Sequence, residues 1–161
     1  MIIKKMLNFS TITGNLIELA LNGEFDVIVH GCNCLSRMGK GLAPQMAKAF
    51  GCDEYPMEKS GPSIFKLGCI DYGSGYTHEG GIFYVVNAYT QYDYKRNNNI
   101  SPIDYEALIL CMRKMNVEFK GKHIGLPRIG AGLAGGNWTK IENIIKYELK
   151  DCRVTIVNYN K

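Results

Sequence analysis

The sequence lacks the ligand spacings of a metal site. Its six cysteines and three histidines include no Cys-x-x-Cys pair and no matched Cys/His set, so neither zinc nor any other metal or cofactor is expected. Several cysteines stand in apolar runs, where a free thiol behaves as a small hydrophobe. This usage is typical of a protein of the reducing cytoplasm.

Long apolar runs and clustered charges of one sign are also missing. No window approaches a membrane span, and residues 1–10 have no apolar signal core. The net charge of +4 is scattered, and the longest basic clusters are the pairs Lys4-Lys5 and Lys95-Arg96. We therefore expect a soluble cytoplasmic monomer without membrane or nucleic-acid partners, with a mild preference for small anionic ligands.

Strand and helix patterns alternate along the 161 residues, without repeats, low-complexity tracts or linkers. This organisation predicts a single domain over residues 1–161. Short β-branched or aromatic runs are typical of strands buried on both faces. They occur at Phe25–His30, Ile82–Ala88, His123–Leu126 and Arg153–Val157, with weaker candidates at Ile2–Asn8 and Ile64–Leu67.

Helical periodicity fills the segments between these runs. A first helix covers Asn15–Asn22, and Gly51 ends a second with Leu42, Met46, Ala49 and Phe50 on its buried face. Ser101 as N-cap and Pro102 start a third, with Tyr105, Leu108, Ile109 and Met112 buried, and a fourth runs from about Trp138, with Ile141, Ile144, Ile145 and Leu149 buried. Strands alternating with helices predict an α/β sheet covered on both faces.

Glycine is concentrated in two loops, each between an expected strand and an expected helix. The first is Gly39-Lys40-Gly41-Leu42, and the second begins Gly130-Ala131-Gly132-Leu133. Ligands of α/β sheets bind outside the carboxyl ends of strands, and helix N-termini present N–H groups to anions. Two such loops could clamp a diphosphate from both sides. The alternative is that the glycines only permit tight turns.

Several known phosphate-site patterns do not fit these loops. The first loop lacks Walker spacing, and the second, although it contains G-x-G-x-x-G, is followed by no βαβ unit with an acidic ribose ligand. A Rossmann site is therefore disfavoured. Cys32 and Arg37 are too close for a cysteine-phosphatase cradle, and no D-x-D motif or carboxylate cluster for two metals is present.

The polar segment from His30 to Cys34 ends a buried strand just before the first loop. Asn33 could hydrogen-bond ribose hydroxyls with both ends of its amide. His30 could supply acid–base catalysis near neutral pH, or it could be a hydrogen-bonded structural histidine at the strand end. Cys32 and Cys34 are expected to pack rather than to act as nucleophiles.

Three motifs resemble those of macro domains. Thr13-Gly14-Asn15-Leu16 is similar to their opening motif, HGCNCLSRMGKGLA to their ribose-and-phosphate loop, and LPRIGAGLAGGNW to their second phosphate loop. The resemblance runs from about Asn8 to Tyr159 and implies a three-layer α/β/α fold with a mixed, mostly parallel sheet. The subfamily it resembles is that of the small ADP-ribose 1″-phosphate phosphatases of yeast and bacteriophages, and VVNAYTQYDY also resembles the phage members.

This resemblance implies a role for each matching position. The adenine would lie at Asn15 and Leu16 and be closed over by Tyr159 or Asn158, with Asn33 facing the distal ribose and His30 carrying the phosphatase chemistry. The diphosphate would be wrapped by two sets of residues: Gly39, Lys40, Gly41 and Leu42 from one side, and Gly130, Ala131, Gly132 and Leu133 from the other.

The sequence departs from the family at positions that matter for chemistry. Macro domains that remove ADP-ribose from glutamate use an aspartate where Ala134 stands here, and a lysine that the VVNAYTQ strand does not offer. That glycosidase mechanism is therefore not expected. Family members also usually carry Asp where this chain has Asn15, which weakens the expected adenine selectivity.

The resemblance favours a slow, metal-free phosphatase acting on ADP-ribose 1″-phosphate, with His30 and Asn33 as the catalytic residues. Two alternatives remain open at this stage. One is a non-catalytic module that binds or sequesters ADP-ribose-type nucleotides. The other is a hydrolase of ADP-ribosyl or O-acetyl-ADP-ribose esters, because the same pocket could serve all three activities.

Overall fold

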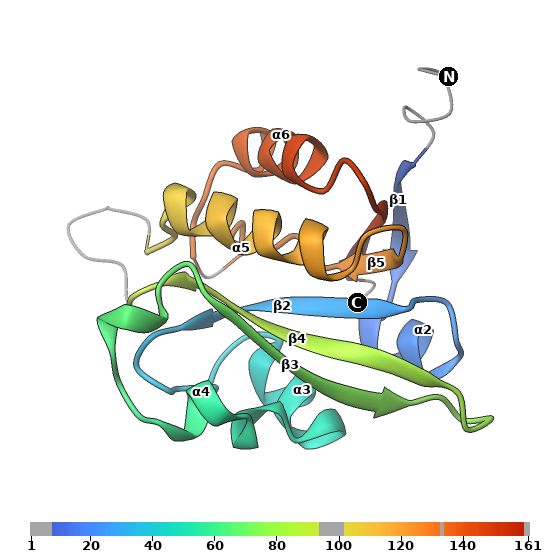
Figure 1. Ribbon diagram of the computed structural model, residues 1–161, viewed down its shortest axis with the longest axis horizontal. Coiled ribbons are helices and arrows are strands. Elements are labelled where there is room, and N and C mark those ends of the chain that lie inside the picture. The colour runs from blue at the N-terminus through green and yellow to red at the C-terminus, as the bar shows by residue number, and fades with distance from the viewer. Residues whose placement is uncertain (1–7, 94–101, 133, 160–161) are drawn as a thin grey trace.

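The apolar runs of the sequence form the inner strands of a six-stranded sheet (Figure 1). The computed structural model describes residues 8–93, 102–132 and 134–159. Its strands are β1 (Phe9–Gly14), β2 (Val27–Asn33), β3 (Ile70–Tyr76), β4 (Ile82–Gln91), β5 (His123–Leu126) and β6 (Arg153–Tyr159). Its helices are α2 (Leu16–Leu21), α3 (Ala43–Phe50), α4 (Pro56–Lys59), α5 (Tyr105–Glu118) and α6 (Trp138–Glu148), with 3₁₀ turns η1 (Cys52–Glu54) and η2 (Ile64–Lys66).

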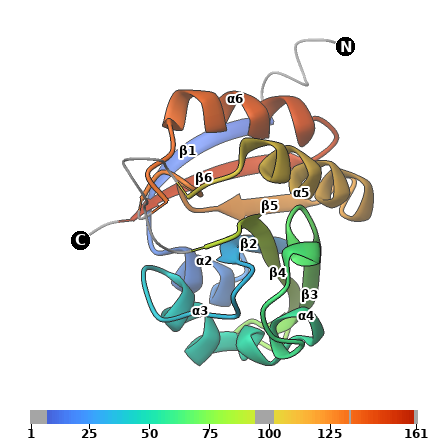
Figure 2. The same ribbon diagram turned by 90° about the vertical axis from the view of Figure 1, so that its left-hand side faces the viewer.

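The strands lie in the order β1-β6-β5-β2-β4-β3. Every neighbouring pair is parallel except β3 and β4, which form an antiparallel pair at one side of the sheet. The mixed, mostly parallel sheet predicted for the chain is therefore confirmed. Because β1, β2, β4, β5 and β6 point the same way, their carboxyl ends share one edge of the sheet, which faces the viewer in Figure 2.

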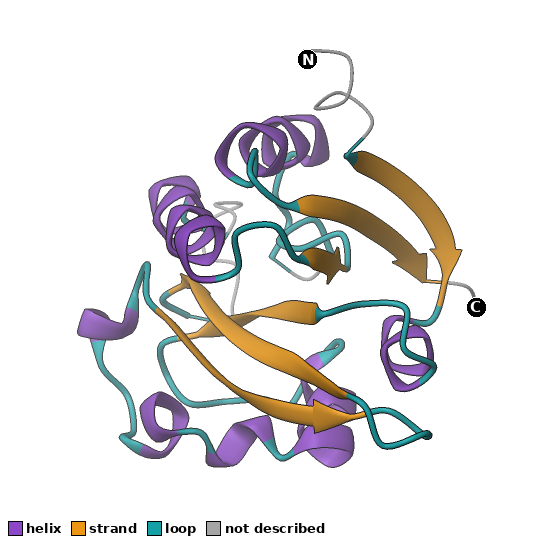
Figure 3. Ribbon diagram, turned by 45° about the vertical axis from the view of Figure 1, so that its right-hand side comes forward, coloured by secondary structure: helices purple, strands orange, loops and turns teal. Residues whose placement is uncertain are grey.

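Helices cover both faces of the sheet, as Figure 3 shows. Alternate side chains of β2 enter different cores, as the period of two in a strand requires. Val27 and Val29 pack with α5 and α6, whereas Ile28 packs with residues of α2 and α3. The three-layer α/β/α architecture predicted for the chain is confirmed.

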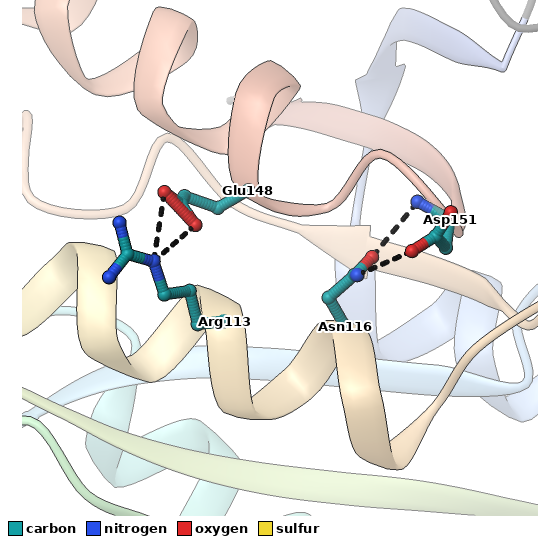
Figure 4. Close-up of polar contacts among 4 residues, drawn as sticks. All are labelled: Arg113, Asn116, Glu148 and Asp151. Atoms are coloured by element: carbon teal, nitrogen blue, oxygen red, sulfur yellow. Dashed lines mark hydrogen bonds and ion pairs between the residues drawn. The ribbon is translucent and has the colours of Figure 1, made fainter.

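Polar contacts join α5 to α6 and to the turn after it (Figure 4). Arg113 Nε donates to Glu148 Oε2 at 2.9 Å, and Glu148 is only 8% exposed. Asn116 donates to Asp151 Oδ2 and accepts from the Asp151 main-chain N–H, each at 2.9 Å. These contacts fix α6, whose first turn follows the second glycine-rich loop.

Two predictions about local structure are wrong. The predicted strand Ile64–Leu67 contains the 3₁₀ turn η2, because the Ser63 hydroxyl accepts from Phe65 N at 3.2 Å and the Phe65 side chain points to solvent. The predicted N-cap Ser101 lies outside the described residues, but α5 begins only at Tyr105. Its N-cap is Asp104, whose carboxylate accepts from Ala107 N at 3.0 Å.

Other boundaries shifted by smaller amounts. Residues 2–7 of the weak candidate Ile2–Asn8 lie outside the described residues, and the first described strand starts at Phe9. Of the side chains predicted to be buried, Ala49 is exposed, and five are half-buried: Leu42, Phe50, Tyr105, Ile109 and Ile144. None of these differences affects the carboxyl edge of the sheet, where the two glycine-rich loops begin.

Candidate functional site

A cavity of about 1110 Å³ opens along the edge where the parallel strands end. Its wall includes the ends of β1, β2, β4 and β6, together with the loops that follow β2 and β5. In an open α/β sheet this edge is where ligands bind. The cavity is also large enough for a dinucleotide-sized ligand, since drug-sized pockets are usually about 300–1,000 Å³.

Most of the residues singled out in the sequence line this cavity. They are Asn15, Leu16, His30, Asn33, Gly39, Lys40, Gly41, Leu42, Gly130, Gly132 and Tyr159. Ala131 stands between two lining glycines without being part of the wall, and Leu133 lies outside the described residues. Of the two candidates at the end of β6, Tyr159 lines the cavity and Asn158 does not.

The first glycine-rich loop leads directly into α3. Gly41 has a left-handed φ of 68°, and Pro44 stands in the first turn of the helix. No hydrogen-bond partner for the main-chain N–H groups of Gly39, Lys40 and Gly41 is found among the described residues. Unpaired N–H groups just before a helix N-terminus form a site that favours an anion.

Glycine has different causes at different places in the second loop. A Cβ at Gly130 would lie 2.0 Å from Ile103 Cδ1, so the fold itself requires glycine there. A Cβ at Gly132 would meet nothing within 4 Å, and its φ lies outside the left-handed region. Gly39 in the first loop is equally unconstrained. The left-handed φ of 76° and the packing of Ile103 therefore explain the glycine at position 130. No neighbouring atom requires glycine at Gly132 or Gly39, which leave open space beside the cavity.

β2 packs closely against the residue that precedes the second loop. A Cβ at Gly31 would lie 3.2 Å from Ile129 Cγ1. Residues of both glycine-rich loops line the same cavity.

The charge of the cavity wall is one-sided. Arg37, Lys40 and Arg128 line it, and its described lining includes no aspartate or glutamate. The Arg128 guanidinium lies over the Trp138 ring, 5.0 Å from its centroid, which holds the cation beside the cavity. Sequence reasoning did not identify Arg37 and Arg128 as site residues, although each stands two residues before a glycine-rich loop.

His30 is almost completely buried in the cavity wall, at 2% exposure. Its Nε2 lies 2.7 Å from Asn87 Oδ1. The Asn87 amide is oriented by its own Nδ2, which donates to the Cys52 carbonyl at 2.9 Å. Asn87 Oδ1 must therefore accept, so Nε2 carries the proton. His30 Nδ1 keeps a lone pair and has no partner among the described residues.

Burial lowers the pKa of His30 to about 4, and the hydrogen bond that Nε2 donates to Asn87 offsets only part of this effect. At neutral pH the imidazole is therefore uncharged and can accept a proton but not donate one from a charged form. Of the acid and base roles predicted for His30 near neutral pH, only that of a base, which accepts a proton, fits an uncharged imidazole. The hydrogen bond expected under the structural alternative is present as well, although His30 lies within β2 and not at its end.

The same pKa shift predicts a pH dependence of stability. Between about pH 4 and the ordinary value of 6.5, the unfolded chain binds a proton at His30 that the folded protein excludes, so stability rises with pH across this window and is level above it. His30→Gln should reduce the rise by about 3 kcal/mol. Urea unfolding from pH 4.5 to 7.5 measures this, with His78→Gln at an exposed histidine as the control. Identical pH profiles for wild type and His30→Gln would contradict the shift.

Asn33 has a different role from the predicted one. Its Oδ1 accepts from Leu35 N at 3.0 Å and from Arg37 N at 3.3 Å, and its Nδ2 donates to Arg37 O at 2.7 Å. Both ends of the amide therefore hold the loop after β2, and Oδ1 is fully used by it, so the expectation that both ends are available to ribose hydroxyls is corrected. One Nδ2 hydrogen remains for a ligand.

The opposite end of the cavity is formed by the start of α2 and the end of β6. Asn15 is the N-cap of α2, with its Oδ1 accepting from Glu18 N at 3.1 Å. This bond leaves the Nδ2 group as the polar end available to the cavity. Tyr159, at 61% exposure, lies at the mouth with its ring largely in solvent.

No group of three or more potential metal ligands is found within residues 8–93, 102–132 and 134–159. All six cysteines are free thiols, and five are buried. Burial raises the pKa of the Cys52 thiol to about 12, so this neighbour of His30 is not an activated nucleophile. No helix in the described part of the chain is long and apolar enough to cross a membrane.

Solved structures identify the class of fold. The chain matches a structure from Bacteroides thetaiotaomicron at 29% identity and a TM-score of 0.73, covering 93% of this chain and 99% of that one. A macrodomain protein from Streptomyces coelicolor matches at 22% and 0.68, covering 95% and 99%. A Trypanosoma brucei macrodomain in complex with ADP-ribose matches at 14% and 0.64, covering 96% and 64%. The protein has the macrodomain fold.

A relative in sequence defines the family more closely. An uncharacterized 17.5 kDa protein of enterobacteria phage T4, from the tk-vs intergenic region, is 33% identical over 156 residues, which cover 92% of this chain and 94% of the phage protein. The chain belongs to the same family as this phage protein. No protein-family model matches the sequence.

Proposed function

We propose that the cavity binds ADP-ribose and that the protein releases phosphate from ADP-ribose 1″-phosphate. The observation that carries this proposal is the wall of the cavity, where three cations and two loops with unpaired N–H groups or open glycines face one space without a carboxylate. Such a wall favours a ligand with a central diphosphate.

The order of the strands suggests how the ligand would lie. Asn15, Leu16 and Tyr159 belong to the β1 and β6 side of the sheet, whereas His30 lies within β2 and Asn33 ends it. With the diphosphate between the loops, the adenine would occupy the first side and the distal ribose the second. The Trypanosoma brucei macrodomain, which shares the fold, was solved in complex with ADP-ribose.

The phosphatase step would rest on His30. A neutral imidazole can accept a hydrogen bond from water at Nδ1. This atom is buried in the structure, so the cavity wall must shift to admit the water that is then oriented toward the phosphorus of the terminal phosphate. A base with a pKa of about 4 is far from the optimum near the working pH, so proton transfer would be inefficient. Phosphate monoesters are also very unreactive without catalysis, and we expect slow turnover.

A binding module without catalysis is the second candidate. It is favoured by the burial of His30 and by the lack of any acidic side chain in the described lining. For the hydrolysis of ADP-ribosyl or acetyl esters, the chain carries buried Ala134 where the glutamate-specific members have their aspartate. β4 also contains no lysine, so this third activity has weaker support.

The experiment that separates these functions is phosphate release from ADP-ribose 1″-phosphate in single-turnover and steady-state assays. The proposal predicts slow, complete release of one phosphate per substrate. A chelator should not change the rate, because no metal-ligand cluster occurs among the described residues. Tight binding of the substrate without phosphate release would establish the binding module instead.

A further inference from the structure

Lys66 is a buried lysine whose ammonium group directly contacts no carboxylate of the described residues. It is 2% exposed, and no acidic oxygen of the described residues lies within 4.0 Å of its Nζ. The ammonium instead donates to Ser36 Oγ at 2.7 Å and lies 5.5 Å from the centroid of the Tyr89 ring. The Lys66 charge also acts on the nearby carboxyls of Glu58 and Asp71, where it offsets part of the rise in pKa that burial causes. The one direct hydrogen bond of the ammonium goes to Ser36, so its effect on the structure is found there.

The partner, Ser36, has an unusual backbone. Its φ of 58° makes it the one residue other than glycine with a positive φ in the described chain. The left-handed region is disfavoured for residues with a Cβ, so contacts must hold Ser36 there. Its hydroxyl provides them, because it donates to the Glu58 carbonyl at 2.7 Å while it accepts from Lys66.

Ser36 lies at the turn that directs the first glycine-rich loop. Before it, the Asn33 amide binds both main-chain groups of Arg37, and Ser63 N donates to the Cys34 carbonyl at 3.0 Å. After it, residues 37–43 all line the cavity. The turn at Ser36 therefore determines where the loop places its N–H groups.

The groups around this anchor form a buried polar cluster under the loop. Tyr89 donates to Glu58 Oε2 at 3.0 Å and lies 3.4 Å from Asp71 Oδ1, and Asp71 accepts from Met57 N at 2.9 Å. These carboxylates are tied to other donors, which leaves Ser36 as the hydrogen-bond acceptor of Lys66. Lys66, Ser36 and the residues around them in this cluster do not line the cavity; the loop that they support, residues 37–43, does.

We propose that Lys66 is a positioning residue that, through Ser36, holds the β2–α3 loop in the left-handed turn required for ligand binding. This inference rests on the proposed function for its ligand, because ADP-ribose is the probe. It assigns a binding role to a side chain that never touches the ligand.

The test compares Lys66→Met, Ser36→Gly, the double variant and Lys114→Met. Methionine keeps the length of Lys66 without its charge, and glycine permits the left-handed φ without the hydroxyl. Lys114 is the matched control, since its Nζ also donates to a protein oxygen at 2.7 Å, the Gly68 carbonyl, away from the cavity. The readouts are the ADP-ribose Kd, kcat at saturating substrate, thermal unfolding, and amide hydrogen exchange of residues 34–42 without ligand.

Lys66→Met is expected to raise the ADP-ribose Kd by about tenfold, within the range by which indirect residues alter binding. Its kcat at saturation should change less than about twofold, because bound ligand restores the loop. Ser36→Gly should match it, and the double variant should be no weaker than either, since both remove one interaction. Exchange at residues 34–42 should accelerate, and a cooperative thermal unfolding transition checks that each variant is folded.

Unchanged Kd and unchanged exchange in Lys66→Met and Ser36→Gly would overturn the inference, as would fully additive losses in the double variant. Equal effects in Lys114→Met would also overturn it. Failure of the proposed function is distinguishable, because it would appear as absent ADP-ribose binding in the wild type. Even then, hydrogen exchange in the ligand-free protein tests whether the hydrogen bond between Lys66 and Ser36 holds the loop in place.

Discussion

Gly132→Glu is expected to weaken ADP-ribose binding by at least about 100-fold, because a carboxylate about 4 Å from a phosphate is repelled by about 4 kcal/mol near a protein surface. The fold should be unaffected, since a Cβ at Gly132 meets no atom within 4 Å and the backbone there is not left-handed. Calorimetric titration of the folded variant measures the loss.

Two further variants make this result specific. Asn143→Glu adds the same charge to an exposed position of α6 outside the cavity and should bind as wild type does. Gly132→Ala tests close approach of the ligand without charge and should give an intermediate loss. Normal binding by folded Gly132→Glu would mean that the second loop only forms a turn.

His30→Ala is expected to lower kcat for phosphate release by about 10²–10⁴-fold, the usual effect of removing a positioned acid or base. The ADP-ribose Kd should change little, because the loops and not His30 supply the diphosphate contacts. Both constants are measured on the same folded variant. His30→Gln, which can still donate to Asn87, separates loss of the base from collapse of its buried surroundings.

If kcat is unchanged in His30→Ala, the histidine has no part in catalysis and the binding module becomes the preferred function. A parallel loss of stability and affinity, with normal turnover per bound substrate, would identify His30 as purely structural. The pH dependence of stability is independent of this outcome, since it depends only on burial of the imidazole.

The sequence was sufficient to predict the parts of the fold with a strong local pattern. β2, β4, β5 and β6 are apolar runs, and the two glycine-rich loops follow β2 and β5 at the common carboxyl edge. β3 was missed because IDYGSGY has the composition of a turn. It forms a strand because Tyr55 and Phe83 place their rings over Gly73 and Gly75, a tertiary effect.

The chemistry of the site depended on contacts between distant residues. The protonation of His30 is set by burial and by Asn87, 57 residues away, so the sequence could suggest a catalytic histidine but not its low pKa. Lys66 belonged to a weak strand pattern, and its bond to Ser36 spans 30 residues. Asn33 lines the predicted cavity, but the sequence did not show that its amide is used to hold the loop formed by Leu35 and Arg37.

Titration of the wild-type protein with ADP-ribose and with NAD by calorimetry tests the central claim most directly. Two loops around a diphosphate that ends in an open ribose predict one ADP-ribose bound per chain, with a micromolar Kd and much weaker binding of NAD. Absence of ADP-ribose binding, or equal affinity for NAD, would contradict the assignment of the cavity.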